Sequence, residues 1–107
     1  MQDQSTRLPL EVNRLVVAFC GDYDRRQDAI RKGDAPPETL AFFSHLNNAI
    51  DTALADVCEA AICTQMRKDI GDGRGARRTP LYYLSEGTYK KRKRAAKYRI
   101  AKQLKLV

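Results

Sequence analysis

Residues 84–104 are the stretch that most constrains the fold, because they predict a helix that is apolar on one side and cationic on the other. Ser85 is a good N-cap, since its hydroxyl can accept a hydrogen bond from a free backbone N–H of the first turn. At helical spacing the apolar side consists of Tyr89, Ala96, Ile100 and Leu104, with Ala101 beside them. The cations that point away from it are Lys90, Lys91, Arg94 and Lys97. One face of this helix can therefore be buried while the other stays positive.

A leucine, a short polar turn and a cationic helix form the pattern expected of the recognition helix of a helix-turn-helix, in which early residues meet base edges and cations meet phosphates. The alternative is that the charge run is a solvated face or a basic tail. Two features favour nucleic-acid binding. A disordered tail needs neither an N-cap nor an apolar stripe at helical spacing. In addition, Glu86 is the only acid among residues 84–107, whereas a solvated helix usually mixes both signs of charge.

The charge of the chain is distributed unevenly. With 107 residues and a net charge of +7, the chain is expected to form one domain with a modest core. Residues 1–66 hold six Lys and Arg against ten Asp and Glu, whereas residues 67–107 hold fourteen against three. The cationic function therefore belongs to the C-terminal part. Such asymmetry favours a polyanionic partner, and counterion release from nucleic acid would make its binding strongly salt-dependent.

The sequence suggests no set of residues for catalysis or metal binding. Cys20, Cys58 and Cys63 lack a C-x-x-C spacing, and His45 is the single histidine. We therefore expect no metal site, no cofactor and no enzymatic activity. An odd number of cysteines without an N-terminal apolar segment indicates a reducing cytosol, with the thiols filling core space. No apolar run is long enough to cross a bilayer, and so we expect a cytoplasmic protein without a membrane partner.

The first half of the chain predicts two long helices. Leu8-Pro9 prepares a helix start, and apolar spacing predicts a helix over about 10–32, with a break possible at Gly21. Gly33 supplies a C-terminal stop, and residues 34–37 form a tight linker. A second pattern predicts a helix over about 38–68, on the order of 45 Å long. Because the first helix cannot cover that length, either the C-terminal helix or a second protomer must pack on it, and a homo-oligomer, a dimer, is expected.

Two further segments leave alternatives open. Asn47-Asn48 lies in the middle of the second predicted helix, where the two amides either face solvent or include one amide buried across a helix interface. Residues 71–78 form a glycine and arginine loop without a phosphate-loop motif, and Arg74, Arg77 and Arg78 are expected to reach a DNA backbone. Residues 79–84 predict a short helix led by Pro80. Tyr82 and Tyr83 on it either stack on bases or pack on the next helix.

The sequence over 84–104 resembles region 4 of sigma factors, whose helix-turn-helix often carries L-S-x-G-T followed by a basic helix. Over a longer span the chain resembles phage late-transcription regulators of the ArpU/RinA type. The matching residues are Tyr23, Asn48 through Asp51, Ser85, Thr88, Tyr89, Lys93 and Ala96. The departure is at residues 71–84, where that family has a full first helix of the motif and this chain has a glycine-rich loop and a short Pro80-led turn.

We therefore expect an all-α fold of two long antiparallel helices (a helical hairpin over 8–70), a short helix and a basic recognition helix, with residues 79–107 as the DNA-binding part. The resemblance implies a double-stranded DNA-binding transcriptional regulator of a phage or prophage, with RNA polymerase as a further partner. It also implies that Glu86, Lys90 and Lys91 meet base edges, while Arg94 and Lys97 sit toward the backbone. The full set of expected DNA contacts is Arg74, Arg77, Arg78, Ser85, Glu86, Thr88, Lys90, Lys91, Arg94 and Lys97.

Two rival functions fit the same residues. A small DNA-recognition subunit of phage packaging would use the same motif, and stable oligomeric rings rather than dimers would favour it. An adaptor whose basic helix binds RNA or an acidic protein is the second rival, and a preference for duplex DNA over RNA in competition would separate it from a regulator.

Overall fold

The computed structural model describes residues 7–73 and 85–107, and every regular element in these ranges is an α-helix. The helices are α1 (Leu10–Gly21), α2 (Tyr23–Lys32), α3 (Pro37–Ala55), α4 (Ala60–Asp72) and α5 (Glu86–Gln103). The all-α prediction is confirmed. In the described ranges no helix combines the length and the apolar character needed to span a membrane.

The helix predicted over 10–32 is divided at Asp22. Gly21 ends α1, and α2 begins at Tyr23, so the break lies at the position where the glycine made one possible. Gly33 ends α2 in the left-handed conformation, with φ of 68°, and its N–H donates to the carbonyls of Ala29 and Ile30. The predicted stop is confirmed, because a glycine adopts this conformation without the steric cost that other residues carry.

The single helix predicted over 38–68 is wrong. The chain instead forms α3 and α4, joined by residues 56–59, although no glycine or proline lies between them. Glu59 is extended (φ −68°, ψ 154°), and the N–H groups of Val57 and Cys58 donate to the Leu54 carbonyl. Turning back at this point buries Ile62, Met66 and Ile70 to 2% exposure or less in the main core. Hydrophobic burial outweighs the local preference to continue the helix, and no 45 Å helix remains to require a second protomer.

Helix α4 also continues further than the sequence indicated. The glycine-rich break was predicted to begin at residue 71, but Gly71 is helical and α4 ends at Asp72. Gly73 then takes the left-handed conformation, with φ of 73°, and is the actual C-terminal stop.

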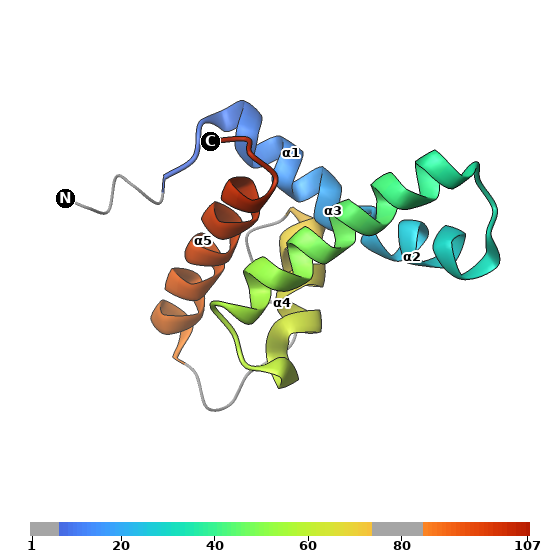
Figure 1. Ribbon diagram of the computed structural model, residues 1–107. Coiled ribbons are helices and arrows are strands. Elements are labelled where there is room, and N and C mark those ends of the chain that lie inside the picture. Colours follow the sequence, from blue (N-terminus) through green and yellow to red (C-terminus); the bar gives the residue numbers. More distant parts are fainter. Residues whose placement is uncertain (1–6, 74–84) are drawn as a thin grey trace.

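The core lies where α1, the second half of α3, α4 and α5 meet (Figure 1). Helix α4 packs mainly on α1, and α5 packs mainly on α3, while α2 also packs on α3. In Figure 1 the end of the α2–α3 hairpin at residues 33–36 points away from α5. The predicted pair of long antiparallel helices is thus replaced by four shorter ones, α1 to α4, of which α1, α3 and α4 meet α5 in the core.

Two polar groups tie α2 to α3. Asn47 is 1% exposed, and its amide accepts from Arg26 Nε (2.7 Å) and donates to Gln27 Oε1 (2.9 Å), whereas Asn48 is exposed. The structure therefore shows the buried amide rather than two solvent-facing ones. Nearby, the Tyr23 hydroxyl lies 2.9 Å from both oxygens of Asp51, so two residues that carry the family resemblance meet at this interface.

Candidate nucleic-acid interface

Helix α5 starts with a side-chain cap. The Ser85 hydroxyl accepts a hydrogen bond from the Thr88 N–H (3.1 Å) and donates to the Thr88 hydroxyl (2.9 Å). Glu86 is the first residue of the helix. The predicted N-cap is confirmed, and both predicted site residues Ser85 and Thr88 serve to fix the helix start, with their side chains exposed.

The inner face of α5 is anchored in the core. Tyr89, Ala96, Ile100 and Ala101 are at most 2% exposed, and Leu104 packs against the same cluster, as the apolar spacing predicted. The Tyr89 hydroxyl donates to Asp69 Oδ2 of α4 (2.6 Å), and Lys93 Nζ lies 3.4 Å from Asp69 Oδ1. Lys93 is only 7% exposed and Asp69 is fully buried. A buried charge needs such a partner, and so α5 is held in one position rather than attached as a loose tail.

One flank of α5 is neutralised by acids from the turn between α3 and α4. Arg92 Nη1 lies 3.3 Å from Glu59 Oε1, and Arg99 Nη1 lies 3.3 Å from Asp56 Oδ2. All four groups are partly or largely exposed, so each pair stabilises the fold by at most about 1 kcal/mol. Because Arg92 and Arg99 already have acidic partners, these two cations of α5 are less available to bind a polyanion.

The side of α5 that faces away from the core carries cations without acidic partners among the described residues. We define the outer face of α5 by its residues at helical spacing, which are Lys91, Arg94, Tyr98 and Lys102. Lys91, Arg94 and Lys102 are exposed, and within the described ranges none of them has an acid within ion-pair distance. Lys102 Nζ lies 5.9 Å from the Tyr98 ring centroid. Lys90 is exposed at the edge of this face. The outer face is thus a row of cations around one aromatic ring.

Lys97 lies on the other edge of the outer face, in a small cavity between α5 and the start of α1. We call it the α1–α5 cavity, of about 150 Å³, and its lining residues are Arg7, Leu8, Asn13, Arg94 and Lys97. Lys97 Nζ donates to Asn13 Oδ1 (3.1 Å). Burial lowers the pKa of the Lys97 ammonium, and the neighbouring charges of Lys93 and Arg94 lower it further. Lys97 was predicted to point away from the fold, but its side chain is half-buried.

The predicted DNA-binding residues divide into two groups. Lys90, Lys91 and Arg94 are exposed together on α5, and Lys97 shares the α1–α5 cavity with Arg94. Arg74, Arg77 and Arg78 and the short first helix of the motif, over 79–84, lie outside the described residues. The helix-turn-helix arrangement therefore stays a prediction. Sequence reasoning did not select Arg7 or Asn13, because only the packing of α1 on α5 brings them to the site.

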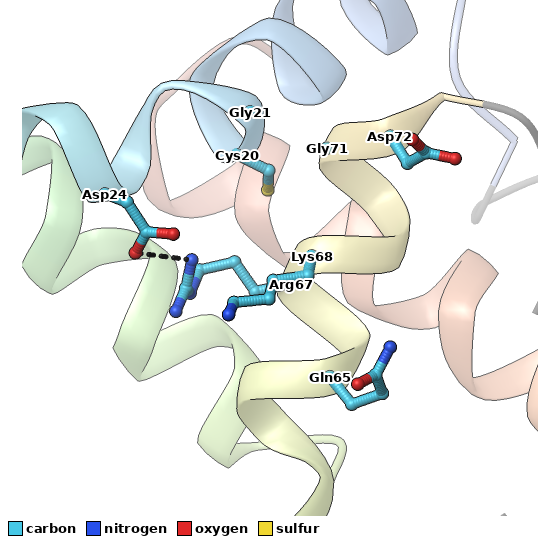
Figure 2. Close-up of a pocket in the computed structure, with 8 residues that line it drawn as sticks. All are labelled: Cys20, Gly21, Asp24, Gln65, Arg67, Lys68, Gly71 and Asp72. Atoms are coloured by element: carbon cyan, nitrogen blue, oxygen red, sulfur yellow. Dashed lines mark hydrogen bonds and ion pairs between the residues drawn. The ribbon is translucent and has the colours of Figure 1, made fainter. Parts of the chain in front are cut away.

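A second cavity, of about 520 Å³, lies where the end of α1 and the start of α2 face α4 (Figure 2). Its charged lining includes Asp24 and Arg67, whose Oδ1 and Nη1 atoms are 3.4 Å apart, and Lys68. The Arg67 guanidinium also lies 3.8 Å from the centroid of the Tyr23 ring. Arg67 is therefore held by an acid and an aromatic ring, and this cavity presents no excess of free cations comparable to the outer face of α5.

The arrangement carries no recognisable catalytic set in the described ranges. Burial raises the pKa of the Cys20 thiol to about 12 and that of the Cys58 thiol to about 11, so neither is a thiolate near neutral pH. His45 is exposed, unlike a histidine that is paired with a nucleophile in an active site. Within residues 7–73 and 85–107 no three His, Cys, Asp or Glu side chains are grouped so that they could hold a metal ion.

The fold and the outer face together define a small all-α domain that presents a capped, core-anchored basic helix. No protein-family model, no curated protein and no solved structure matches the chain. The resemblance to phage late-transcription regulators accordingly rests on the motif residues alone.

Proposed function

We propose that this protein binds double-stranded DNA through the outer face of α5 and acts in the control of transcription. The observation that carries the proposal is that Lys91, Arg94 and Lys102 stand exposed and without acidic partners on one side of a helix whose other side is fixed in the core. A helix held in this way presents its cations at fixed positions, which lowers the entropy lost when they meet phosphates.

The dimensions of α5 suit the major groove. An α-helix with its side chains is about 10–12 Å across, and the major groove of B-DNA is about 12 Å wide. At the start of α5, no described atom beyond the chain neighbours and the helix's own backbone lies within 4 Å of the position that a Cβ on Gly87 would take, which favours a close approach at the helix start. These features favour entry by the first turns, where Lys90 and Lys91 would meet base edges while Arg94 and Lys102 meet phosphates.

A role in transcription rests on the resemblance over residues 84–104, and RNA polymerase belongs to that part of the proposal as a partner. An RNA-binding protein is the second candidate, and one observation favours it. Tyr98 lies in the middle of the outer face and is only half-buried, and an accessible ring among cations is typical of sites that stack single-stranded bases.

Selection of bound duplexes from a random pool, with a competing single-stranded RNA pool, tests the proposal. We expect duplex enrichment with a preferred sequence, and log K that falls steeply with log salt. Lys91→Ala should cost about 1–3 kcal/mol on the preferred site and relax discrimination at one base pair. Arg99→Gln is the matched control, because Arg99 lies on the same helix but is paired with Asp56.

Enrichment of RNA over duplex would favour the second candidate. Affinity for duplexes that does not change with salt, or that Lys91→Ala and Arg99→Gln lower by the same factor on specific and random sequences, would contradict the proposal.

A further inference from the structure

The α1–α5 cavity concentrates positive charge. Among the residues that the structure describes, five line the cavity, of which three are the cations Arg7, Arg94 and Lys97 and none is an Asp or Glu. Asp69 is the acid whose charge acts on Lys97, but it is fully buried against Tyr89 and Lys93 and does not line the cavity. The described part of the cavity is therefore an electropositive recess lined with hydrogen-bond donors and without an acidic side chain.

Keeping Lys97 in this position works against stability. Burial and the charges of Lys93 and Arg94 all lower the pKa of its ammonium, which means that the charged form is disfavoured there relative to water. The hydrogen bond to Asn13 Oδ1 uses one donor of the ammonium and leaves the amide NH₂ of Asn13 as a further donor. Cations whose charged form is disfavoured in the fold, and whose donors line one recess, are typical of a site that binds an anion.

The size of the recess selects the kind of anion. At about 150 Å³ the cavity is well below the roughly 300–1,000 Å³ of sites that enclose a drug-sized ligand, so a nucleoside does not fit inside it. A tetrahedral phosphate group does fit, with its oxygens toward two guanidinium groups, an ammonium and an amide. A guanidinium group can donate two parallel hydrogen bonds to two phosphate oxygens. Arg94 belongs both to the cavity and to the outer face of α5, so the two are continuous.

We propose that the α1–α5 cavity binds one phosphate group, and that in the complex this is a backbone phosphate of the nucleic acid that lies along the outer face of α5. This inference rests on the proposed function for its source of phosphate. It extends the binding surface from α5 to the segment before α1, where Arg7 reaches the same phosphate as Lys97.

The test uses three single variants and one double variant of the full chain with a DNA duplex. Arg7→Gln and Lys97→Met each remove one cavity charge, and Arg99→Gln removes a cation of α5 outside the cavity. If Arg7 and Lys97 bind the same phosphate, the double variant Arg7→Gln/Lys97→Met should flatten the plot of log K against log salt by no more than about 0.9, since Arg94 still contacts that phosphate, whereas two separate phosphates would give about 1.8. Arg99→Gln should leave the slope unchanged.

Two further measurements complete the test. The unfolding midpoint separates a binding role of Lys97 from a structural one, and titration with inorganic phosphate separates free phosphate from DNA phosphate as the ligand. The unfolding midpoint of Lys97→Met should equal or exceed that of the wild type, because a disfavoured buried charge is removed; a structural role would lower it. Inorganic phosphate, added without DNA, should shift the NMR signals of the Asn13 amide saturably in the wild type but not in Arg7→Gln/Lys97→Met. Such shifts in a protein that binds no duplex would support a phosphate site for free phosphate while the proposed function fails.

The inference is overturned if Lys91→Ala weakens duplex binding but the cavity variants leave both the salt slope and the response to inorganic phosphate unchanged. That result would leave the proposed function in place and assign all contacts to the outer face.

Discussion

At the scale of single residues, the backbones of Gly21 at the end of α1 and Gly71 near the end of α4 approach each other closely. A Cβ on Gly71 would lie 2.7 Å from Gly21 N and 2.8 Å from Gly21 Cα, and no backbone atom there can yield as a flexible side chain would. We expect Gly71→Ala to destabilise the fold by about 1–3 kcal/mol despite the better helix propensity of alanine, measured by urea unfolding.

Two other glycines serve as comparisons for Gly71. A Cβ on Gly21 would lie 3.1 Å from Gly71 O, so Gly21→Ala should cost less, and Gly87 has nothing within 4 Å, so Gly87→Ala should be neutral or stabilising. Equal stabilities of Gly71→Ala and Gly87→Ala would show that the two helices can separate without cost.

Buried thiols give the protein a specific sensitivity to alkali. Burial raises the pKa of Cys20 to about 12, from the ordinary value of 9.0 for a thiol. Above pH 9 the unfolded chain therefore loses this proton before the folded chain does, and stability falls as pH rises from 9 toward 12, by up to about 1.4 kcal/mol per pH unit for this thiol.

Urea unfolding at several pH values across this window, compared with Cys20→Ala, measures that effect. The variant should start less stable but lose less stability per pH unit. Burial, the largest cause of the lowered pKa of Lys97, is present in both proteins, so its opposite effect on stability cancels in the comparison except for the smaller charge coupling between Lys97 and Cys20. Parallel pH curves for the two proteins would mean that the thiol ionises without unfolding.

Polar residues in the core are where sequence reasoning was weakest at this scale. The spacing of residues 89–104 predicted the buried Tyr89, Ala96 and Ile100, but Lys93 lies on the same side of α5 and was not predicted to be buried. Its partner Asp69 lies on α4 and contacts it only in the folded protein. A charge pattern along one helix cannot show which acid of another helix will accept a buried cation.

At the scale of elements, the hydroxyl of Tyr89 is a direct tie between α5 and α4. Tyr89→Phe removes the hydrogen bond to Asp69 and leaves that buried carboxylate with Lys93, so we expect a loss of about 1.5–3 kcal/mol, as is usual for hydrogen bonds to charged groups. Tyr98→Phe is the matched control, because Tyr98 lies on the outer face, and it should change stability by less than about 0.5 kcal/mol. Chemical unfolding followed by circular dichroism compares them, and equal midpoints would mean that the Tyr89 hydroxyl contributes nothing to docking.

Element boundaries were predicted well at two places where a local signal marks them. Ser85 before α5 and Gly33 after α2 act through their own backbone and side chain, and both were read correctly. The end of α3 at Ala55 has no such signal, because the following residues up to Glu59 include neither glycine nor proline. That turn is set by the burial of Ile62, Met66 and Ile70 in the core. This burial depends on the tertiary fold and cannot be read from the local sequence.

At the scale of the whole molecule, the uneven charge of the sequence becomes an uneven surface on α5. The acids of the turn between α3 and α4 neutralise one flank, through Glu59 and Asp56, and leave the outer face positive. The sequence predicted which helix carries the excess charge, but not which of its sides is neutralised, since that depends on where the turn at residues 56–59 is placed. Lys91 and Arg94 were predicted correctly to be exposed, whereas Arg7 at the same surface was not predicted at all.

The hydrogen bond between Lys97 and Asn13 joins positions 84 residues apart. The recess around it therefore cannot form in any partly folded state that has only its local helices, because both walls exist only after the chain has closed on itself. Any phosphate affinity that depends on this recess therefore requires the complete fold and does not arise when the helices alone have formed. A misfolded or proteolytically shortened chain would keep its positive charge but lose the proposed phosphate site, so on this proposal only the intact fold would bind through the recess.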